Sequence, residues 1–175
     1  MNSALFLDRD GVINVDYGYV HNKKDFHFIE HIFELVRYAN SLDFLVVVIT
    51  NQAGIARGLY SEDDFNKLTL WMNNQFISNG AKIDKTYFCP YHEDGDIKKY
   101  AKDSFLRKPN PGMIDMACEE LNIDPKKSIL VGDKETDIIA GNIAGISKCI
   151  YFNKNECNIA FKSVNNLNQI IKEFT

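Results

Sequence analysis

Two aspartates one residue apart are the most chemically informative feature of the chain. Asp8 and Asp10 follow the apolar run Leu5–Leu7, and Gly11 comes directly after them. Residues two apart in an extended chain point to the same side, so both carboxyl groups can face one reactant at the end of a buried strand. Two carboxylates at close range repel each other and raise one pKa, unless a metal ion or a lysine offsets them. The pair therefore predicts a site that also contains a cation.

These two acids suit phosphoryl transfer. Asp8 can attack phosphorus and form an aspartyl-phosphate, which splits one difficult displacement into two easier ones. Asp10 can donate a proton to the departing alkoxide and later take one from the water that cleaves the intermediate. Both half-reactions would then use the same pair of side chains.

Two later residues can bind a phosphoryl group. Thr50 ends the apolar run 46–49, so its hydroxyl and the backbone N–H groups after it can hold equatorial phosphoryl oxygens. Lys108 supplies a cation, and Pro109 and Pro111 stiffen the loop that carries it.

A fourth segment completes a site for a hard metal ion. Asp133 follows the apolar run 129–131, and Asp137 lies four residues further on, where a helix begins. Mg²⁺ prefers oxygen ligands, so Asp8, Asp133, a backbone carbonyl of Asp10, waters and the phosphate would complete its octahedron. Singly, each motif is as well explained by a turn, a strand end, a solvated charge or a helix start. Their order and joint placement favour the chemical interpretation.

Hydrophobic patterning predicts the elements that hold these residues. Apolar and β-branched runs predict strands at Ala4–Leu7, Phe44–Ile49, Ile83–Phe88, Ile129–Val131 and Cys149–Phe152. Amphipathic segments predict helices at Ile32–Ala39, Ser61–Ser78, Met113–Leu121, Asp137–Ala144 and Leu167–Glu173. This alternation indicates an α/β fold, a three-layer α/β/α sandwich around a mainly parallel sheet. Ligands of such sheets bind at the carboxyl ends of the strands, where the polar residues fall.

The size and composition favour a single domain over residues 1–175, with a short flap at about 90–107. With a formal net charge of −4, the chain has no basic field that would attract nucleic acid. The longest apolar run, 44–49, is too short to cross a membrane. We therefore expect a cytoplasmic protein without membrane or nucleic-acid partners and, by default, a monomer. Its cysteines should be reduced, at positions Cys89, Cys118, Cys149 and Cys157.

The order of the motifs resembles the haloacid dehalogenase (HAD) superfamily of phosphotransferases. Its four motifs match Asp8-x-Asp10-Gly11, Thr50, Lys108 and Gly132-Asp133-x-x-x-Asp137. From about Ala4 to Phe152 the chain is also similar to the branch of D-glycero-D-manno-heptose 1,7-bisphosphate phosphatases and histidinol-phosphate phosphatases, in segments 6–14, 16–20, 50–58, 89–90, 107–113 and 132–134. The resemblance implies a HAD-like, Rossmann-type fold. The interval between Asp10 and Thr50 is too short for a large cap domain.

The resemblance also implies a role for each matched residue. The catalytic set consists of Asp8 as nucleophile, Asp10 as general acid and base, and Thr50 and Lys108 as phosphoryl stabilisers. The magnesium set consists of Asp8, Asp133 and the backbone carbonyls of Asp10 and Lys134, with Asp137 behind them. The substrate-binding set consists of Asp16, Tyr17, Gly18, Tyr19, Asn51, Gln52, Ala53, Arg57, Arg107 and Lys134.

The flap departs from the pattern of this branch. Relatives carry a zinc site there, built as Cys-x-His followed by Cys-x-Cys, whereas this chain has Cys89-Pro90-Tyr91 and Ser104-Phe105-Leu106, with His92 out of register. Because a structural zinc ion needs four good ligands, no zinc is expected. The flap should instead be held by the packing of Tyr91, Tyr100, Phe105 and Leu106.

The leading functional hypothesis is a Mg²⁺-dependent phosphatase that removes the C7 phosphate of a heptose 1,7-bisphosphate. Its product would serve nucleotide-heptose and surface-polysaccharide synthesis, such as lipopolysaccharide or capsule. Arg57 and Arg107 suit a second phosphate, because guanidinium groups bind phosphate bidentately. The alternatives are a phosphatase of another small phosphosugar and a phosphatase of histidinol phosphate, whose amine Asp16 could bind. A phospho-accepting receiver module also uses acids, Mg²⁺, Thr and Lys, but in another chain order.

Overall fold

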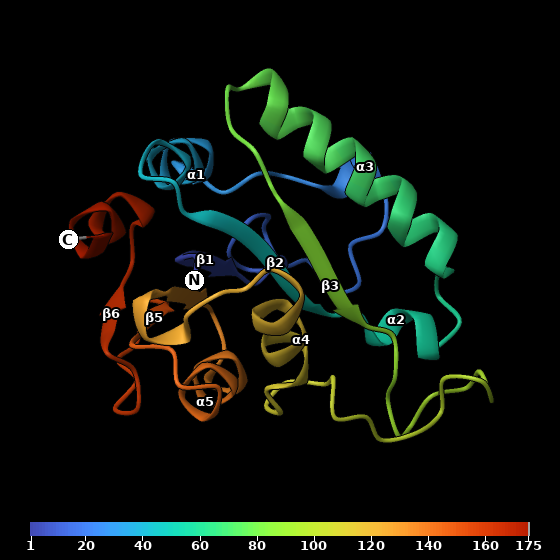
Figure 1. Cartoon of the computed structure of the whole chain (residues 1–175). Helices are drawn as coiled ribbons and strands as arrows, with labels where there is room; N and C mark the ends of the chain where they lie inside the picture. The colour runs from blue at the N-terminus through green and yellow to red at the C-terminus, as the bar shows by residue number, and fades with distance from the viewer. Residues whose placement is uncertain (175) are drawn as a thin grey trace.

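In the computed structural model of the chain, which describes residues 1–174, six parallel strands form one sheet (Figure 1). The strands are β1 (Ala4–Leu7), β2 (Leu45–Asn51), β3 (Lys85–Cys89), β4 (Ile129–Gly132), β5 (Lys148–Phe152) and β6 (Lys162–Val164). Their order is β3-β2-β1-β4-β5-β6, so β1 lies between β2 and β4. The middle of the sheet therefore brings together the carboxyl ends of β1, β2 and β4.

Helices cover both faces of this sheet (Figure 1). One face carries α1 (Ile32–Ser41), α3 (Glu62–Ser78) and the 3₁₀ helix η3 (Leu167–Phe174). The other face carries α4 (Gly112–Glu120) and α5 (Glu135–Ile143). Three short helices complete the chain: η1 (Lys23–Asp25), α2 (Ala53–Ala56) and η2 (Pro125–Lys127). The predicted three-layer α/β/α sandwich is thus confirmed.

The apolar strands follow from this double coverage. All of β1 is buried: Leu5 and Leu7 join the core under α1 and α3, while Ala4 and Phe6 join the core under α4 and α5. Because successive side chains of a strand point to opposite faces, a strand with helices on both sides must be apolar throughout. The apolar run ends where the sheet ends, and the first acid stands at that edge.

The predicted strands and helices are present with shifted ends, and several short elements were not predicted. β2 continues through Thr50 and Asn51, so these polar residues still lie on the strand. The strand β6 was missed because it has only three residues, two of them the polar Lys162 and Ser163, and lies at the sheet edge. The four-residue helix α2 is too short to show a helical period. The predicted C-terminal helix is present as the 3₁₀ helix η3.

Two expected absences can be compared with residues 1–174. Between β1 and β2 the described chain has only η1 and α1 as helices, so no large cap domain is inserted there. None of the described helices combines the length and apolar character needed to cross a lipid bilayer.

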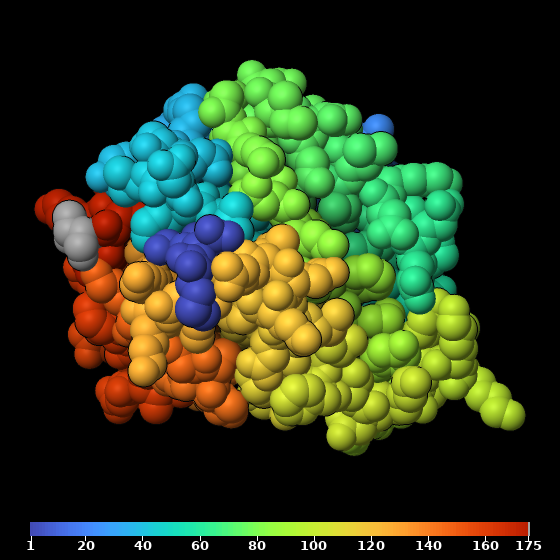
Figure 2. Space-filling model, viewed as in Figure 1, coloured from blue at the N-terminus to red at the C-terminus, as the bar shows by residue number. Residues whose placement is uncertain are grey.

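The flap at 90–107 has neither helix nor strand and extends along one edge of the molecule below α2 (Figures 1 and 2). Tyr91, Tyr100 and Leu106 pack against core clusters, as predicted. The prediction is wrong for Phe105, which leaves 62% of its surface exposed. The flap is therefore attached through three of the four expected side chains.

The helix α3 begins at a capping box and turns one face to the sheet. The Ser61 hydroxyl accepts from the Asp64 backbone N–H at 3.1 Å, and the Asp64 carboxylate accepts from the Ser61 backbone N–H at 2.9 Å. The helix then buries a stripe with helical spacing: Phe65, Leu68, Met72 and Phe76.

Truncating this stripe should destabilise the protein far more than truncating the opposite face of α3. Met72 is fully buried, so Met72→Ala should lower the free energy of unfolding by about 2–5 kcal/mol through lost burial and a cavity. Leu70 is 64% exposed, and Leu70→Ala should cost less than about 1 kcal/mol. Urea unfolding followed by circular dichroism measures both; equal losses would contradict the packing described.

Candidate active site

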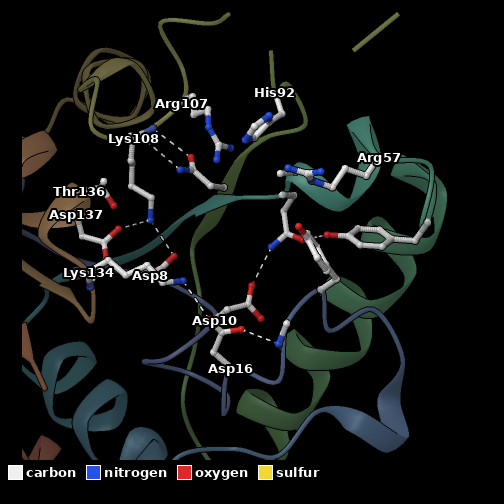
Figure 3. A pocket seen from close by; sticks show the side chains of 16 residues that line it. Asp8, Asp10, Asp16, Arg57, His92, Arg107, Lys108, Lys134, Thr136 and Asp137 are labelled. Atoms are coloured by element: carbon white, nitrogen blue, oxygen red, sulfur yellow. Dashed lines mark hydrogen bonds and ion pairs between the residues drawn. The ribbon is translucent and has the colours of Figure 1, made fainter. Parts of the chain in front are cut away.

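The carboxyl ends of β1, β2 and β4 open into a cavity of about 510 Å³ (Figure 3). Asp8, Lys108 and Asp137 gather on one side of it. The side chains of Arg57 and Arg107 also line the cavity and point away from this group, although Arg107 directly precedes Lys108 in the same loop. The cavity therefore has an acidic end with one buried lysine and a second end with two guanidinium groups.

Lys108 is the centre of a buried charge cluster. Its ammonium group donates to Asp8 Oδ1 at 2.8 Å and to the Ile49 carbonyl at 2.9 Å, and it pairs with Asp137 Oδ1 at 2.7 Å. Lys108 is 3% exposed and Asp8 is 5% exposed. The Lys108 nitrogen thus joins four parts of the chain: the end of β1, β2, the loop before α4 and the first turn of α5.

The charges in this cluster shift one another's pKa values. Burial raises the pKa of Asp8 well above its usual value, and Asp137 and Asp133 add to the rise, although Lys108 opposes it. Burial by itself lowers the pKa of Lys108, but attraction to Asp137 and Asp8 outweighs burial and raises it. Lys108 therefore stays a cation, and a further positive charge beside Asp8 would favour its ionised form.

Asp133 provides the best evidence for a cation beside Asp8. Its Oδ1 is buried and has no hydrogen-bond partner within the described structure. Burial raises the pKa of Asp133 to about 6, with Asp137 adding to the rise and Lys134 opposing it. A buried, unpartnered carboxylate oxygen is costly unless a ligand binds it.

The donor set around this oxygen fits Mg²⁺. Asp8, Asp133 and Asp137 each have a carboxylate oxygen within 4.8 Å of the others, and they are the one such group found in residues 1–174. Asp137 is already committed, because Oδ1 pairs with Lys108 and Oδ2 accepts from the Lys134 backbone N–H at 3.0 Å. Asp8 and Asp133 are therefore the side chains that can hold the ion, with all-oxygen ligands. The supporting role expected for Asp137 stays a prediction.

Gly11 leaves the space that Asp133 occupies. A Cβ atom at Gly11 would lie 2.2 Å from Asp133 Oδ2, and Gly11 has a φ of +99°. Both the left-handed backbone and the close approach require glycine. The Asp-x-Asp-Gly sequence thus places β1 and β4 close enough to share one ion.

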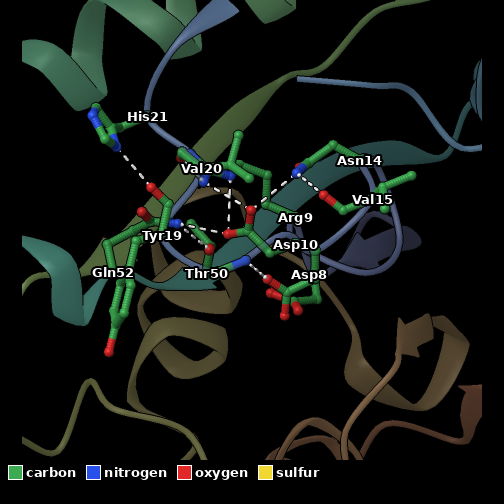
Figure 4. A network of polar contacts seen from close by, with 12 residues as sticks. Asp8, Arg9, Asp10, Asn14, Val15, Tyr19, Val20, His21, Thr50 and Gln52 are labelled. Carbon is green, nitrogen blue, oxygen red and sulfur yellow. Dashed lines mark hydrogen bonds and ion pairs between the residues drawn. The ribbon is translucent and has the colours of Figure 1, made fainter. Parts of the chain in front are cut away.

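The carboxylate of Asp10 is held by several donors (Figure 4). Oδ1 accepts from Arg9 Nη2 at 2.9 Å and Asn14 Nδ2 at 3.0 Å. Oδ2 accepts from Arg9 Nε at 3.1 Å and Gln52 Nε2 at 3.1 Å. Arg9 is 1% exposed, and its Nη2 also donates to the Val20 carbonyl at 2.6 Å. The orientation of Asp10 is therefore fixed by β1, β2 and the loop before η1.

The end of β2 holds Thr50 and, through Asn51, the loop that carries Lys108. The Thr50 hydroxyl is buried and accepts from Gln52 Nε2 at 2.8 Å. The Asn51 amide donates to the Lys108 carbonyl at 3.0 Å and accepts from the Lys108 backbone N–H at 3.1 Å. These two bonds fix the backbone of the lysine loop against β2.

The loop after β1 closes another side of the cavity. Asp16 accepts from the Gly18 backbone N–H at 3.0 Å and from the Lys134 ammonium group at 3.0 Å. Burial alone raises the pKa of Asp16, but these donors outweigh it and lower the pKa. The Asp16 carboxylate is therefore already paired within the protein.

Most of the predicted site residues line the cavity: Asp8, Asp10, Asp16, Gly18, Tyr19, Asn51, Gln52, Ala53, Arg57, Arg107, Lys108, Lys134 and Asp137. Three predicted residues are outside this lining. Thr50 is buried beneath Gln52, and Asp133 lies beside Gly11. Tyr17 is 60% exposed and stacks edge-on against His27. The sequence thus predicted the cavity well, and the individual roles stay predictions.

Three residues that line the cavity were not predicted to do so: Tyr60, His92 and Thr136. Thr136 follows Lys134 by two positions, so the Gly-Asp motif could have indicated it. His92 was considered only as a zinc ligand. Tyr60 and the buried Arg9 carry no sequence signal, because their importance depends on contacts between separate elements.

Cys89, the one cysteine at the start of the flap, is directed into the protein. Its thiol is buried and donates to the Tyr91 carbonyl at 3.9 Å. Burial raises the pKa of this thiol, although the Tyr91 contact and Arg107 oppose the rise. The absence of zinc from the flap stays a prediction.

Known proteins show which family this arrangement belongs to. A family model described as HAD-hydrolase-like matches residues 105–153. D-glycero-alpha-D-manno-heptose-1,7-bisphosphate 7-phosphatase of Burkholderia mallei is 54% identical over 145 residues, 83% of this chain and 77% of the relative. The corresponding beta enzyme of Pasteurella multocida is 41% identical over 181 residues, 98% of each protein. The chain belongs to the HAD superfamily of phosphatases.

A solved structure agrees with the fold of this HAD phosphatase. The D,D-heptose 1,7-bisphosphate phosphatase from B. bronchiseptica, complexed with magnesium and phosphate, aligns with a TM-score of 0.85. The alignment covers 98% of this chain and 97% of that chain at 23% identity, so this likeness concerns the fold. The superfamily inferred from the motifs is confirmed, and with it a phosphate-ester hydrolase.

Magnesium should stabilise the folded HAD phosphatase through Asp133. A ligand present at about 100 times its dissociation constant raises the free energy of unfolding by about 2.7 kcal/mol. For a chain of this length that is a rise in melting temperature of about 5–10 °C. Asp133→Asn should lose most of the rise, whereas Asp63→Asn should keep it, because Asp63 is exposed on α3 and pairs only with Lys67. Thermal melts with and without Mg²⁺ test this; the same rise in Asp133→Asn would exclude the proposed ligand.

Proposed function

We propose that the protein is a Mg²⁺-dependent phosphatase that converts D-glycero-D-manno-heptose 1,7-bisphosphate to heptose 1-phosphate. The observation that supports it most is the contact of Asp8 with Lys108 beside the unpartnered Asp133 oxygen, at the end of a cavity whose other end carries two arginines. The relatives' names agree with this substrate. The cavity thus offers a place for each of two phosphates.

In the first step, a carboxylate oxygen of Asp8 attacks the phosphorus of the C7 phosphate. The bond from phosphorus to the C7 oxygen breaks, and Asp10 gives its proton to that oxygen. The products are an aspartyl-phosphate and heptose 1-phosphate. The positive charge of Lys108 offsets the charge on the phosphoryl group, while its ammonium group stays bonded to Asp8, the Ile49 carbonyl and Asp137.

In the second step, a water attacks the aspartyl-phosphate. Asp10 takes a proton from this water, the bond from phosphorus to Asp8 breaks, and inorganic phosphate leaves with Asp8 restored. A bound Mg²⁺, held by Asp8, Asp133 and the carbonyls of Asp10 and Lys134, would neutralise charge on the carboxylates and the phosphoryl group. The hydrogen bonds from Arg9 and Gln52 keep Asp10 in place through both steps.

The opposite end of the cavity suits the second phosphate. Arg57 Nε is buried without a partner in the described structure, so the guanidinium group is free to bind a ligand there. Within residues 1–174, the one hydrogen bond of the Arg107 side chain is a long one, 3.4 Å to the Tyr91 carbonyl. His92 lies beside both (Figure 3). A guanidinium pair with unused donors binds a phosphate dianion well.

Histidinol phosphate fits this cavity less well. Its amine needs a carboxylate, but Asp16 is already paired with Lys134 and the Gly18 backbone. The far end of the cavity holds two arginines, which repel an ammonium group. The bisphosphate therefore complements the cavity better than the amine does.

The remaining expectations form part of this proposal. The protein is a single domain over residues 1–175 and acts as a cytoplasmic monomer without zinc. It supplies heptose 1-phosphate for nucleotide-heptose and surface-polysaccharide synthesis.

A phosphate-release screen tests the substrate. The set contains both anomers of heptose 1,7-bisphosphate, fructose 1,6-bisphosphate and histidinol phosphate. One heptose anomer should exceed histidinol phosphate in kcat/KM by about tenfold or more, the scale of one charge-assisted contact. Asp8→Asn should lower kcat by about 10⁴-fold or more, the scale of removing a catalytic nucleophile. A preference for histidinol phosphate would contradict the proposed substrate. An active Asp8→Asn variant would contradict the proposed mechanism.

The second-phosphate site makes a separate prediction. Arg57→Ala should lower kcat/KM for the bisphosphate by about 10- to 100-fold, because hydrogen bonds to charged groups contribute about 1.5–3 kcal/mol. With heptose 7-phosphate, which lacks the second phosphate, the same change should alter kcat/KM by less than about threefold. Arg37→Ala is the matched control, since Arg37 on α1 donates only to the Asn79 carbonyl. Equal losses of kcat/KM on both substrates would show that Arg57 does not act through the second phosphate.

A further inference from the structure

Tyr60 begins a chain of hydrogen bonds that ends at the proposed acid and base. Its hydroxyl donates to Gln52 Oε1 at 2.5 Å, and Gln52 Nε2 donates to Asp10 Oδ2 at 3.1 Å and to the Thr50 hydroxyl at 2.8 Å. Gln52 is 1% exposed. Both ends of the Gln52 amide are therefore used inside the protein.

The Tyr60 hydroxyl favours one orientation of this amide. With the Gln52 oxygen toward Tyr60, the NH₂ group faces the carboxylate of Asp10 and the oxygen of Thr50. The opposite orientation would turn the amide oxygen toward the Asp10 carboxylate, where two acceptors repel. Burial raises the pKa of Tyr60, with Arg9 opposing, so the hydroxyl keeps its proton and remains a donor.

The Tyr60 ring is itself fixed on two sides. His21 stacks on it with the ring centroids 5.0 Å apart and the planes at 12°. A Cβ atom at Gly54 would lie 2.2 Å from Tyr60 Cε1, so the backbone of α2 lies close against the ring. The ring also packs with Ile55 and Phe65. A tyrosine with so little freedom can hold its hydroxyl at one point.

We propose that Tyr60 is a positioning residue, which acts through Gln52 to hold Asp10 in line with the leaving oxygen. The inference rests on the proposed function, in which Asp10 protonates that oxygen. Tyr60 makes no bond to Asp8, Lys108 or Asp133, so it affects proton transfer and leaves the attack on phosphorus unchanged.

This role predicts a dependence on the leaving group. An alkyl phosphate needs the proton from Asp10, because an alkoxide is a poor leaving group. An aryl phosphate such as p-nitrophenyl phosphate releases a stable phenolate without it. The ratio kcat/KM covers the steps up to formation of the aspartyl-phosphate. A misplaced Asp10 should therefore lower kcat/KM for the alkyl substrate only.

The experiment compares Tyr60→Phe with the wild type on heptose 1,7-bisphosphate and on p-nitrophenyl phosphate. For the bisphosphate, kcat/KM should fall about tenfold, a part of the 10²–10⁴-fold contribution of general acid catalysis. For the aryl phosphate it should change less than about twofold. Tyr87→Phe is the matched control: Tyr87 is also a buried ring with its hydroxyl bonded to a side chain, Glu120, but it packs in the core on the α4 side of the sheet. It should change neither rate.

A double-mutant cycle tests the route through Gln52. In a Gln52→Met background, which lacks the amide, Tyr60→Phe should have no further effect on the bisphosphate. Thermal melts of every variant show whether the protein is folded. An equal fall on both substrates, or a full additional loss in the Gln52→Met background, would overturn the inference.

Asp10→Asn separates this inference from the proposed function. If the wild type releases no phosphate from the bisphosphate, the proposed function fails. If Asp10→Asn lowers kcat/KM equally for both substrates, the proposed mechanism fails. If Asp10→Asn shows the leaving-group dependence and Tyr60→Phe does not, only the role of Tyr60 fails.

Discussion

The site depends on the balance of charge around Lys108. Three carboxylates, those of Asp8, Asp133 and Asp137, lie within reach of one ion, and one buried ammonium group faces them. When all three are ionised, they exceed this ammonium group by two negative charges at a largely buried site. A divalent cation removes the excess. Burial, with the neighbouring carboxylates, raises the pKa values of Asp8 and Asp133, and Asp133 Oδ1 has no partner within the described structure.

The fold makes this concentration of charge possible. Asp8 and Lys108 are separated by 100 positions in the sequence, yet they are in contact because β1 lies between β2 and β4. The apolar strands bury the backbone on both faces, so the first polar side chains occur at the edge where all three strands end. Every group that the chemistry needs is therefore held by rigid elements or by a loop bonded to them, as the two Asn51 bonds hold Lys108.

How far the sequence predicts this protein depends on the range of each interaction. The layers could be predicted, because alternating apolar runs report which faces are covered. The acids and Lys108 could be predicted from their order, and Arg57 from its segment. Gln52 was predicted to bind the substrate, and that role stays a prediction, but its bonds to Asp10, Thr50 and Tyr60 were not predicted. Such a network joins three elements, and no local pattern reports it. The same applies to Phe105, whose exposure depends on the path of the flap.

Arg9 shows why the residue between the two acids matters as much as the acids. Its guanidinium group lies 5.8 Å from the ring centres of both Phe26 and Phe65, and it bonds to both oxygens of Asp10. Removing one member of such a buried pair leaves the other charge unpaired, at a cost of about 3–5 kcal/mol. The third bond of Arg9, to the Val20 carbonyl, connects this pair to the loop that carries Asp16 and Tyr19. A shift of that loop would therefore move Asp10, so the positions of the substrate loop and of the acid are set together.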